Sequence, residues 1–142
     1  MLPRTDATSD NCDYSLELVW DEDLNATAVT ESGAPIRVGP AASLSPQHLL
    51  ALAASSCLMT ALLRLAREAG LSVHGYVSSA RLHDTPGAAP HVALTSCVVV
   101  ESDVDRGRVE QLWPQAIERS PTLRLLGTHS QVELTVRVVP QG

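Results

Sequence analysis

A long run without any helix-breaking residue, from position 46 to position 69, constrains the fold of this chain more than any other feature. Ser45 is a favourable N-cap, Pro46 is preset for the first helical position, and Gly70 suits the end of the last turn. We therefore predict a helix of roughly 24 residues, about 36 Å long. Its front half is apolar around most of its circumference, so we expect that half to be buried nearly all round.

The segments on both sides of this helix predict strands. Before the helix, alternating or β-branched residues indicate strands at 15–20, 26–31 and 35–38. After it, the same signals indicate strands at 72–83, 91–101 and 131–139. This order predicts an α+β fold in one domain, residues 14–142, behind a flexible N-terminal tail at residues 1–13.

A second, amphipathic helix is expected at 105–119. Pro114 lies inside it and should kink or break it, because proline lacks the N–H that the helix needs there. A short irregular or helical segment should then begin at Ser120 and Pro121.

Composition excludes several classes of function. The 142 residues are 44% hydrophobic and 18% charged, which is typical of a soluble globular domain. A net charge of −6 and few aromatic residues argue against nucleic-acid binding. The uncharged stretch 49–63 is too short to span a membrane, and the first residues lack a signal-peptide pattern, so we expect a cytoplasmic protein with no membrane partner.

The three cysteines, Cys12, Cys57 and Cys97, lack the spacing of a metal site, and so do the five histidines. We therefore expect no metal and no cofactor. In a reducing compartment the cysteines should be free thiols.

The segment 44–65, LSPQHLLALAASSCLMTALLRL, resembles the core helix of the OsmC/Ohr family, in which a proline-started helix carries small residues and then a reactive cysteine. The order of predicted strands and helices is also similar, and the resemblance covers nearly the whole chain after the tail. It implies an OsmC-like fold with antiparallel sheets around a long central helix bearing Cys57. It also implies an intertwined homodimer with active sites at the subunit interface.

The resemblance further implies a thiol-dependent peroxidase that reduces organic hydroperoxides and is regenerated by dithiol reductants, in oxidative or osmotic stress defence. By position, Cys57 matches the peroxide-attacking cysteine, and Arg37 matches the arginine of OsmC-type members. Two positions depart from the family pattern: Gln47 replaces a glutamate, and Ser120 replaces the resolving cysteine that precedes a proline. We therefore expect an external thiol to resolve oxidised Cys57.

A peroxidatic cysteine must react as the thiolate, and burial opposes its ionisation. Cys57 lies about three turns into its helix, beyond the reach of the helix dipole. The chain has no lysine, so Arg37 is the predicted activating cation, donating to the thiolate and to the peroxide oxygen. Gln47 can accept a hydrogen bond from Arg37, and His48 can approach the loop that carries it.

Each of these residues also has a purely structural interpretation. Cys57 fits a small core hydrophobe, and Arg37, Gln47 and His48 fit exposed surface positions. Cys97 lies in the middle of a predicted strand, where it is either a buried structural thiol or faces the core helix. Cys12, in the tail, is either a spectator or a thiol that reaches a sulfenic acid.

Two functions therefore compete. The first is a one-cysteine hydroperoxide reductase that uses Cys57. The alternative is a catalytically degenerate OsmC-like protein that binds a small apolar ligand at the dimer interface.

Overall fold

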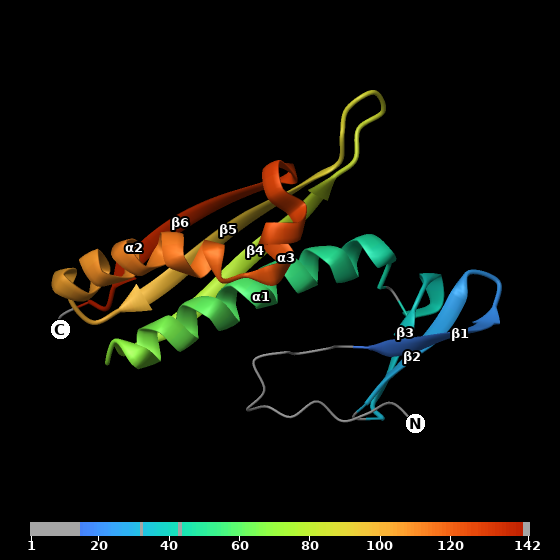
Figure 1. Cartoon of the computed structure of the whole chain (residues 1–142), viewed down its shortest axis with the longest axis horizontal. Coiled ribbons are helices and arrows are strands. Elements are labelled where there is room, and N and C mark those ends of the chain that lie inside the picture. The colour runs from blue at the N-terminus through green and yellow to red at the C-terminus, as the bar shows by residue number, and fades with distance from the viewer. Residues whose placement is uncertain (1–14, 32, 43, 141–142) are drawn as a thin grey trace. The chain divides into compact units, whose positions relative to one another are not determined.

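The predicted long helix is present as α1, Pro46–Glu68, in the computed structural model of the chain (Figure 1). At its start the His48 N–H donates to Ser45 Oγ at 3.2 Å, as expected of an N-cap. At its end Gly70 adopts a φ of 68°, and the Leu71 N–H donates to the Ala66 carbonyl at 2.8 Å. The predicted capping signals therefore define both ends of the helix.

The structure describes residues 15–31, 33–42 and 44–140. The predicted tail, residues 1–13 with Cys12, lies outside the described residues. The chain divides into two units, Met1–Leu49 and Leu50–Gly142, and each contains one three-stranded sheet.

The sheet of the first unit is antiparallel. It consists of β1 (Leu16–Glu22), β2 (Asn25–Thr30) and β3 (Pro35–Val38), in that order. A short 3₁₀ turn, η1 (Pro40–Ala42), follows the last strand. Gly39 before it has a φ of 127°, and a Cβ there would lie 2.5 Å from the Leu24 carbonyl oxygen, so only glycine fits.

The sheet of the second unit consists of β4 (Gly75–His83), β5 (His91–Val100) and β6 (Ser130–Val138), in that order. β4 pairs with β5 antiparallel, but β6 pairs with β5 parallel. This sheet is therefore mixed, whereas the sequence analysis expected antiparallel sheets. The helical crossover between β5 and β6 explains the difference, because a parallel neighbour requires such a connection. The α+β class is confirmed.

The crossover contains two helices, α2 (Asp103–Glu118) and α3 (Pro121–Leu126), and a 3₁₀ turn, η2 (Gly127–His129). α2 continues through Pro114, so the predicted break does not occur there. The chain instead leaves α2 at Arg119 and starts α3 at Ser120.

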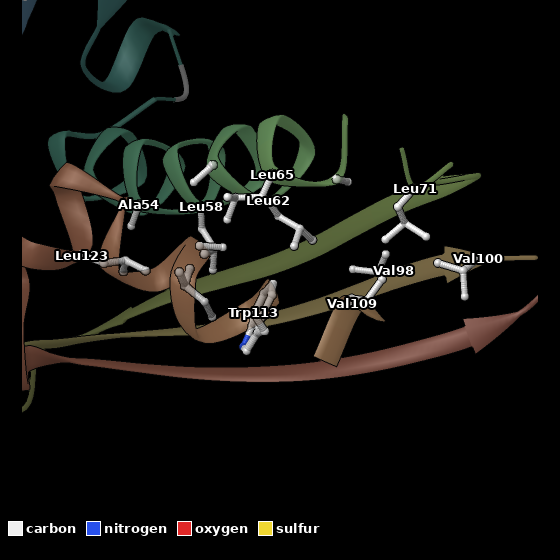
Figure 2. Close-up of a cluster of buried hydrophobic side chains, with 14 of the residues drawn as sticks. Ala54, Leu58, Leu62, Leu65, Leu71, Val98, Val100, Val109, Trp113 and Leu123 are labelled. Carbon is white, nitrogen blue, oxygen red and sulfur yellow. The ribbon is translucent and has the colours of Figure 1, made fainter. Parts of the chain in front are cut away.

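The core of the second unit lies between the sheet and the helices that cover one of its faces (Figure 2). Alternate residues of β5 are almost fully buried and face the helices, among them Val92, Leu94 and Val98. Trp113 of α2 and Leu123 of α3 complete the same cluster. The α1 residues in this cluster are Ala54, Leu58, Ala61, Leu62, Leu65 and Ala66.

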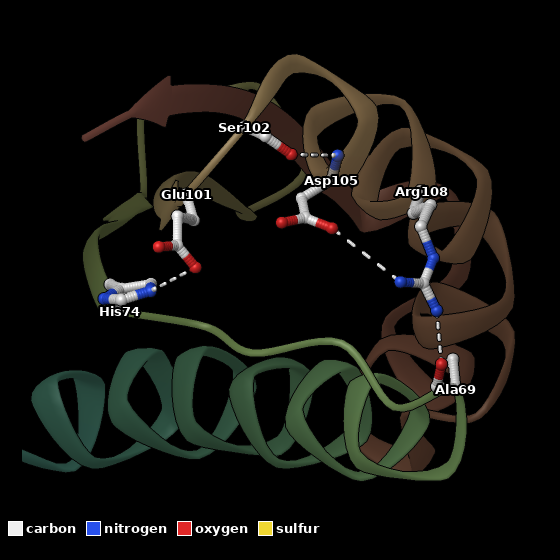
Figure 3. Close-up of polar contacts among 6 residues, drawn as sticks. All are labelled: Ala69, His74, Glu101, Ser102, Asp105 and Arg108. Carbon is white, nitrogen blue, oxygen red and sulfur yellow. Dashed lines mark hydrogen bonds and ion pairs between the residues drawn. The ribbon is translucent and has the colours of Figure 1, made fainter. Parts of the chain in front are cut away.

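A set of polar contacts ties the end of α1 to the start of α2 (Figure 3). Ser102 caps α2 by accepting a hydrogen bond from the Asp105 N–H at 3.2 Å. Arg108 lies 3.7 Å from the Asp105 carboxylate and donates to the Ala69 carbonyl, just beyond α1. These contacts satisfy polar groups at a helix start and at a helix end together.

The opposite face of α1 is exposed, which corrects the expectation that its front half is buried nearly all round. Leu52 is 58% exposed, and Leu50, Ala53 and Ser56 are exposed too. Among the described residues of the second unit, the sheet and the crossover helices cover one side of α1 only.

By length and composition α1 could cross a membrane, which the uncharged stretch 49–63 did not indicate. Its buried face, however, packs into the core against the sheet. This is the packing of the core helix of a soluble protein.

The core packing of α1 leads to a stability prediction. Leu62 is fully buried, so Leu62→Ala should lower the free energy of unfolding by about 2–5 kcal/mol. Leu125, which is 88% exposed, provides the matched control, and Leu125→Ala should change the free energy of unfolding by about 0.5 kcal/mol or less. Urea unfolding at one protein concentration measures both variants. Equal effects would contradict the placement of Leu62 in the core.

Candidate active site

Cys57 lies at the border between the buried and exposed faces of α1. Its neighbour Leu58 and the residue one turn earlier, Ala54, are fully buried, whereas Ser56 is exposed. The Cys57 side chain is accordingly half-buried and is a free thiol. It combines an apolar surrounding with access from solvent.

The start of α3 packs against this turn of α1. Leu123 of α3 is buried in the same cluster as Ala54 and Leu58, and Figure 2 shows it beside them. Ser120, the N-cap of α3, is fully buried, and its hydroxyl accepts a hydrogen bond from the Leu123 N–H. The packing of Leu123 thus fixes the first turn of α3 next to Cys57.

Four groups of α3 act on the Cys57 thiol. Burial raises the pKa of the thiol, but hydrogen bonds from the Ser120 hydroxyl and from the backbone and side chain of Thr122 lower it. The positive charge of Arg124 lowers it further. The net result is a pKa below the ordinary value of a cysteine, so that more of the reactive thiolate is present at neutral pH.

The Ser120 hydroxyl can act on both of its neighbours at once. A hydroxyl has one hydrogen to donate and two lone pairs that accept. Its oxygen accepts from the Leu123 N–H at 3.5 Å, which leaves its hydrogen for the sulfur of Cys57. Ser120 therefore links the capping of α3 to the ionisation of the thiol.

The structure adds a cation that the sequence analysis did not consider. Arg124 donates its backbone N–H to the Ser120 carbonyl at 3.0 Å, which places it one turn after the N-cap. The segment Ser-Pro-Thr-Leu-Arg carried the signal, because a capping serine and an arginine four residues later share one helix face. Arg37, the predicted activator, is exposed on β3 in the first unit and is paired in register with Thr27; its role stays a prediction.

The two other predicted supporting residues lie in the first turn of α1. His48 is part of the helix cap, since its Nδ1 lies 2.7 Å from Ser45 Oγ. Gln47 is exposed, and no hydrogen bond joins it to Arg37 among the described residues. The orientation of Arg37 by Gln47 therefore remains a prediction.

Cys97 does not face the core helix, which corrects one of its two expected placements. Ser96 and Val98 on either side are almost fully buried, so the alternation of β5 directs Cys97 to the outer face of the sheet. It is half-buried there and free. The sheet thus lies between Cys97 and Cys57, and we expect no disulfide between them within one chain.

Two further features of the described residues bear on metal and ligand binding. No group of three or more possible metal ligands occurs among residues 15–31, 33–42 and 44–140. The first unit contains an apolar hollow of about 560 Å³, lined by Leu24, Gly39, Pro40, Ser45, Pro46 and His48. Its volume lies in the range of small-molecule pockets, about 300–1,000 Å³.

Comparison with known families decides the classification. The sequence profile of the OsmC-like protein family matches residues 39–135, which include α1, Cys57 and Ser120. The chain belongs to the OsmC-like family. Its α+β architecture with a long helix is that of solved OsmC-like structures, so the fold expected from the segment 44–65 is confirmed.

Three solved structures illustrate the similarity of this OsmC-like chain. An OsmC-like protein of unknown function from Vibrio cholerae is 17% identical, with 89% of this chain and 99% of that chain covered and a TM-score of 0.70. An organic hydroperoxide resistance protein OsmC from Legionella pneumophila is 17% identical, with 92% and 100% covered and a TM-score of 0.66. The organic hydroperoxide resistance protein OhrB of Bacillus subtilis is 18% identical, with 89% and 98% covered and a TM-score of 0.63. No curated protein matches the chain.

The position that the OsmC resemblance assigned to a resolving cysteine is next to Cys57 in this OsmC-like protein. Ser120 occupies it and supplies a hydrogen-bond donor in place of a second thiol. Cys57 and the residue at position 120 are thus neighbours, as the resemblance implied, but Ser120 can donate a hydrogen bond and cannot form a disulfide.

The hydrogen bond from Ser120 leads to a testable prediction. Ser120→Ala removes the donor that lowers the pKa of Cys57 most, so alkylation of Cys57 by iodoacetamide at neutral pH should slow several-fold. The pH at half-maximal rate should rise, because burial raises the pKa of Cys57 and the hydrogen bond that opposes this effect is lost. Mass spectrometry of the Cys57 peptide over a pH series measures both.

Two controls make this test specific. Ser79→Ala changes an exposed serine of β4 and should leave the rate unchanged. Circular dichroism checks the fold of Ser120→Ala, since loss of an N-cap costs about 1 kcal/mol. An unchanged pH profile in folded Ser120→Ala would exclude Ser120 as a donor to the thiolate.

Proposed function

We propose that this OsmC-like protein reduces organic hydroperoxides through Cys57 and that an external thiol resolves the oxidised cysteine. The observation that carries the proposal is the half-buried Cys57 thiol with its lowered pKa beside the start of α3. A structural core cysteine would have the opposite shift, because burial alone raises the pKa of a thiol. The organic hydroperoxide resistance proteins among its structural neighbours support the same assignment.

The reaction proceeds in two stages. The Cys57 thiolate attacks one oxygen of the hydroperoxide, the O–O bond breaks, and the other oxygen leaves as the alcohol after taking up a proton. Cys57 is now a sulfenic acid. An external thiol then reduces it, because Ser120 cannot form a disulfide.

The α3 groups have defined roles in the first stage. Ser120 and Thr122 donate hydrogen bonds to the thiolate. Arg124, the cation on the same helix, stabilises negative charge on the sulfur and on the leaving oxygen. Arg37 stays in the proposal as a second activating cation, and Arg37→Ala should then slow Cys57 alkylation in addition to the effect of Ser120→Ala.

The proposal includes an intertwined homodimer in the cytoplasm, acting in oxidative or osmotic stress defence. Exposed apolar residues support the dimer: Leu50 and Leu52 on α1, and Leu16, Leu18 and Trp20 on β1. Exposed apolar residues on each unit are typical of protein interfaces. A second copy of the chain would cover it.

The alternative function is favoured by one observation, the apolar hollow of the first unit. In that case the protein would bind a small apolar ligand, and Cys57 would not react with hydroperoxides. The two functions differ in what happens to the Cys57 thiol on contact with a peroxide.

Oxidation by peroxides tests the proposal directly. On mixing the full chain with one equivalent of cumene hydroperoxide, the Cys57 thiol should be lost rapidly, and faster than with hydrogen peroxide, because its surroundings are apolar. Mass spectrometry of the Cys57 peptide follows the reaction. Cys97→Ser should react like the parent chain, whereas Cys57→Ser should not consume the peroxide.

A Cys57 thiol that stays reduced for many minutes would contradict the peroxidase function and favour the alternative. Binding of apolar ligands to the hollow of the first unit would then be the property to measure.

A further inference from the structure

Arg124 lies one turn after Ser120 on α3, beside the proposed reactive thiol, and no described carboxylate pairs with it. It is exposed on α3, and its charge acts on Cys57. Some other arginines of the second unit lie within ion-pair distance of a carboxylate: Arg106 pairs with Asp103, and Arg119 pairs with Glu68. Within the described part of the chain, no Asp or Glu lies within ion-pair distance of Arg124. An anion in solution therefore finds an unpaired positive charge at this position.

The oxidised form of Cys57 needs a thiol from outside the described residues. Ser120 occupies the contacting position on α3 and has no sulfur. Cys97 is on the far face of the sheet. An incoming thiol that reaches Cys57 therefore meets the groups of α3 that act on this sulfur.

We propose that the thiol that resolves the Cys57 sulfenic acid carries a negatively charged group, and that Arg124 binds this group as the thiol attacks. This inference rests on the proposed function and adds to it the chemical class of the reductant, an acidic monothiol. Arg124 is then the residue that selects the reductant.

The chemistry balances with such a thiol. The thiolate of the reductant attacks the Cys57 sulfur, a mixed disulfide forms, and the hydroxyl of the sulfenic acid leaves as water after taking up a proton. A second molecule of the thiol attacks the sulfur that came from the first. The products are the disulfide of the reductant and the Cys57 thiolate, so two thiols are oxidised for each hydroperoxide reduced.

The overall charge of the protein makes this selection measurable. The chain carries a net charge of −6, which repels anions in general. A preference for an anionic thiol can therefore arise only from a local cation. For an exposed pair of charges, we expect an advantage of about two- to five-fold in rate at low salt.

The test compares three small thiols of different charge: mercaptopropionate, mercaptoethanol and cysteamine. The full chain is oxidised with one equivalent of cumene hydroperoxide, and mass spectrometry follows the loss of the sulfenic acid after each thiol is added. Rates are divided by the thiolate concentration of each reagent at the pH used. The expected order at low salt is anionic, then neutral, then cationic.

Three variants test whether Arg124 causes this order of rates. Arg124→Gln should abolish or reverse the order, whereas Arg124→Lys should keep most of it, because the charge is retained. Arg137→Gln removes an exposed arginine of β6 whose position in the alternation faces away from the core, and it should leave the order unchanged.

Each other outcome overturns the inference in a distinct way. Equal rates for the three thiols, or the same order in Arg124→Gln, would overturn the role of Arg124 while Cys57 oxidation still supports the peroxidase. Loss of the sulfenic acid without added thiol, with a disulfide to Cys12 in the peptide map, would show internal resolution instead. A Cys57 that is never oxidised would remove the proposed function itself.

Discussion

The burial of Leu123 in one apolar cluster with Ala54 and Leu58 is the interaction on which the candidate site depends. It holds the first turn of a six-residue helix, α3, against the turn of α1 that carries Cys57. So short a helix is not stable alone, since isolated helices shorter than about 12–15 residues are marginal in water. The buried apolar contact and the Ser120 cap therefore stabilise α3, and α3 in turn brings its polar groups to the thiol.

Two opposing effects determine how readily the Cys57 thiol ionises at this site. The apolar surrounding that lets α3 pack also penalises the thiolate. Donors from Ser120 and Thr122 and the charge of Arg124 outweigh that penalty. In the proposed function, Ser120 removes the internal disulfide step but supplies a donor that favours the reactive form of the Cys57 thiol.

The sequence predicted much of the fold because local signals were strong. Ser45, Pro46 and Gly70 defined α1, and alternation defined the strands. The parallel pairing of β6 with β5 and the exposed face of α1 were not predicted, because both depend on which elements share a sheet or cover a helix. Local periodicity carries no information on that choice.

The site was predicted less completely than the fold. The resemblance identified Cys57 and pointed to Ser120, but it assigned the activating charge to Arg37 alone. Thr122 and Arg124 were missed because their effect depends on the docking of α3 onto α1. The spacing of Ser120 and Arg124 places both on one helix face, but it does not show what that face contacts. The expectation that an arginine activates the thiol followed from the absence of lysine and stays a prediction, and the sequence offered ten arginines to choose from.

The central claim is that the groups of α3 hold Cys57 as a reactive thiolate. The most direct measurement is a pH titration of thiolate absorbance in the full chain with Cys12→Ser and Cys97→Ser, so that Cys57 is the one cysteine left. We expect a midpoint below that of an ordinary cysteine thiol. A midpoint at or above the ordinary value would mean that burial dominates and that the α3 groups do not hold Cys57 as a thiolate.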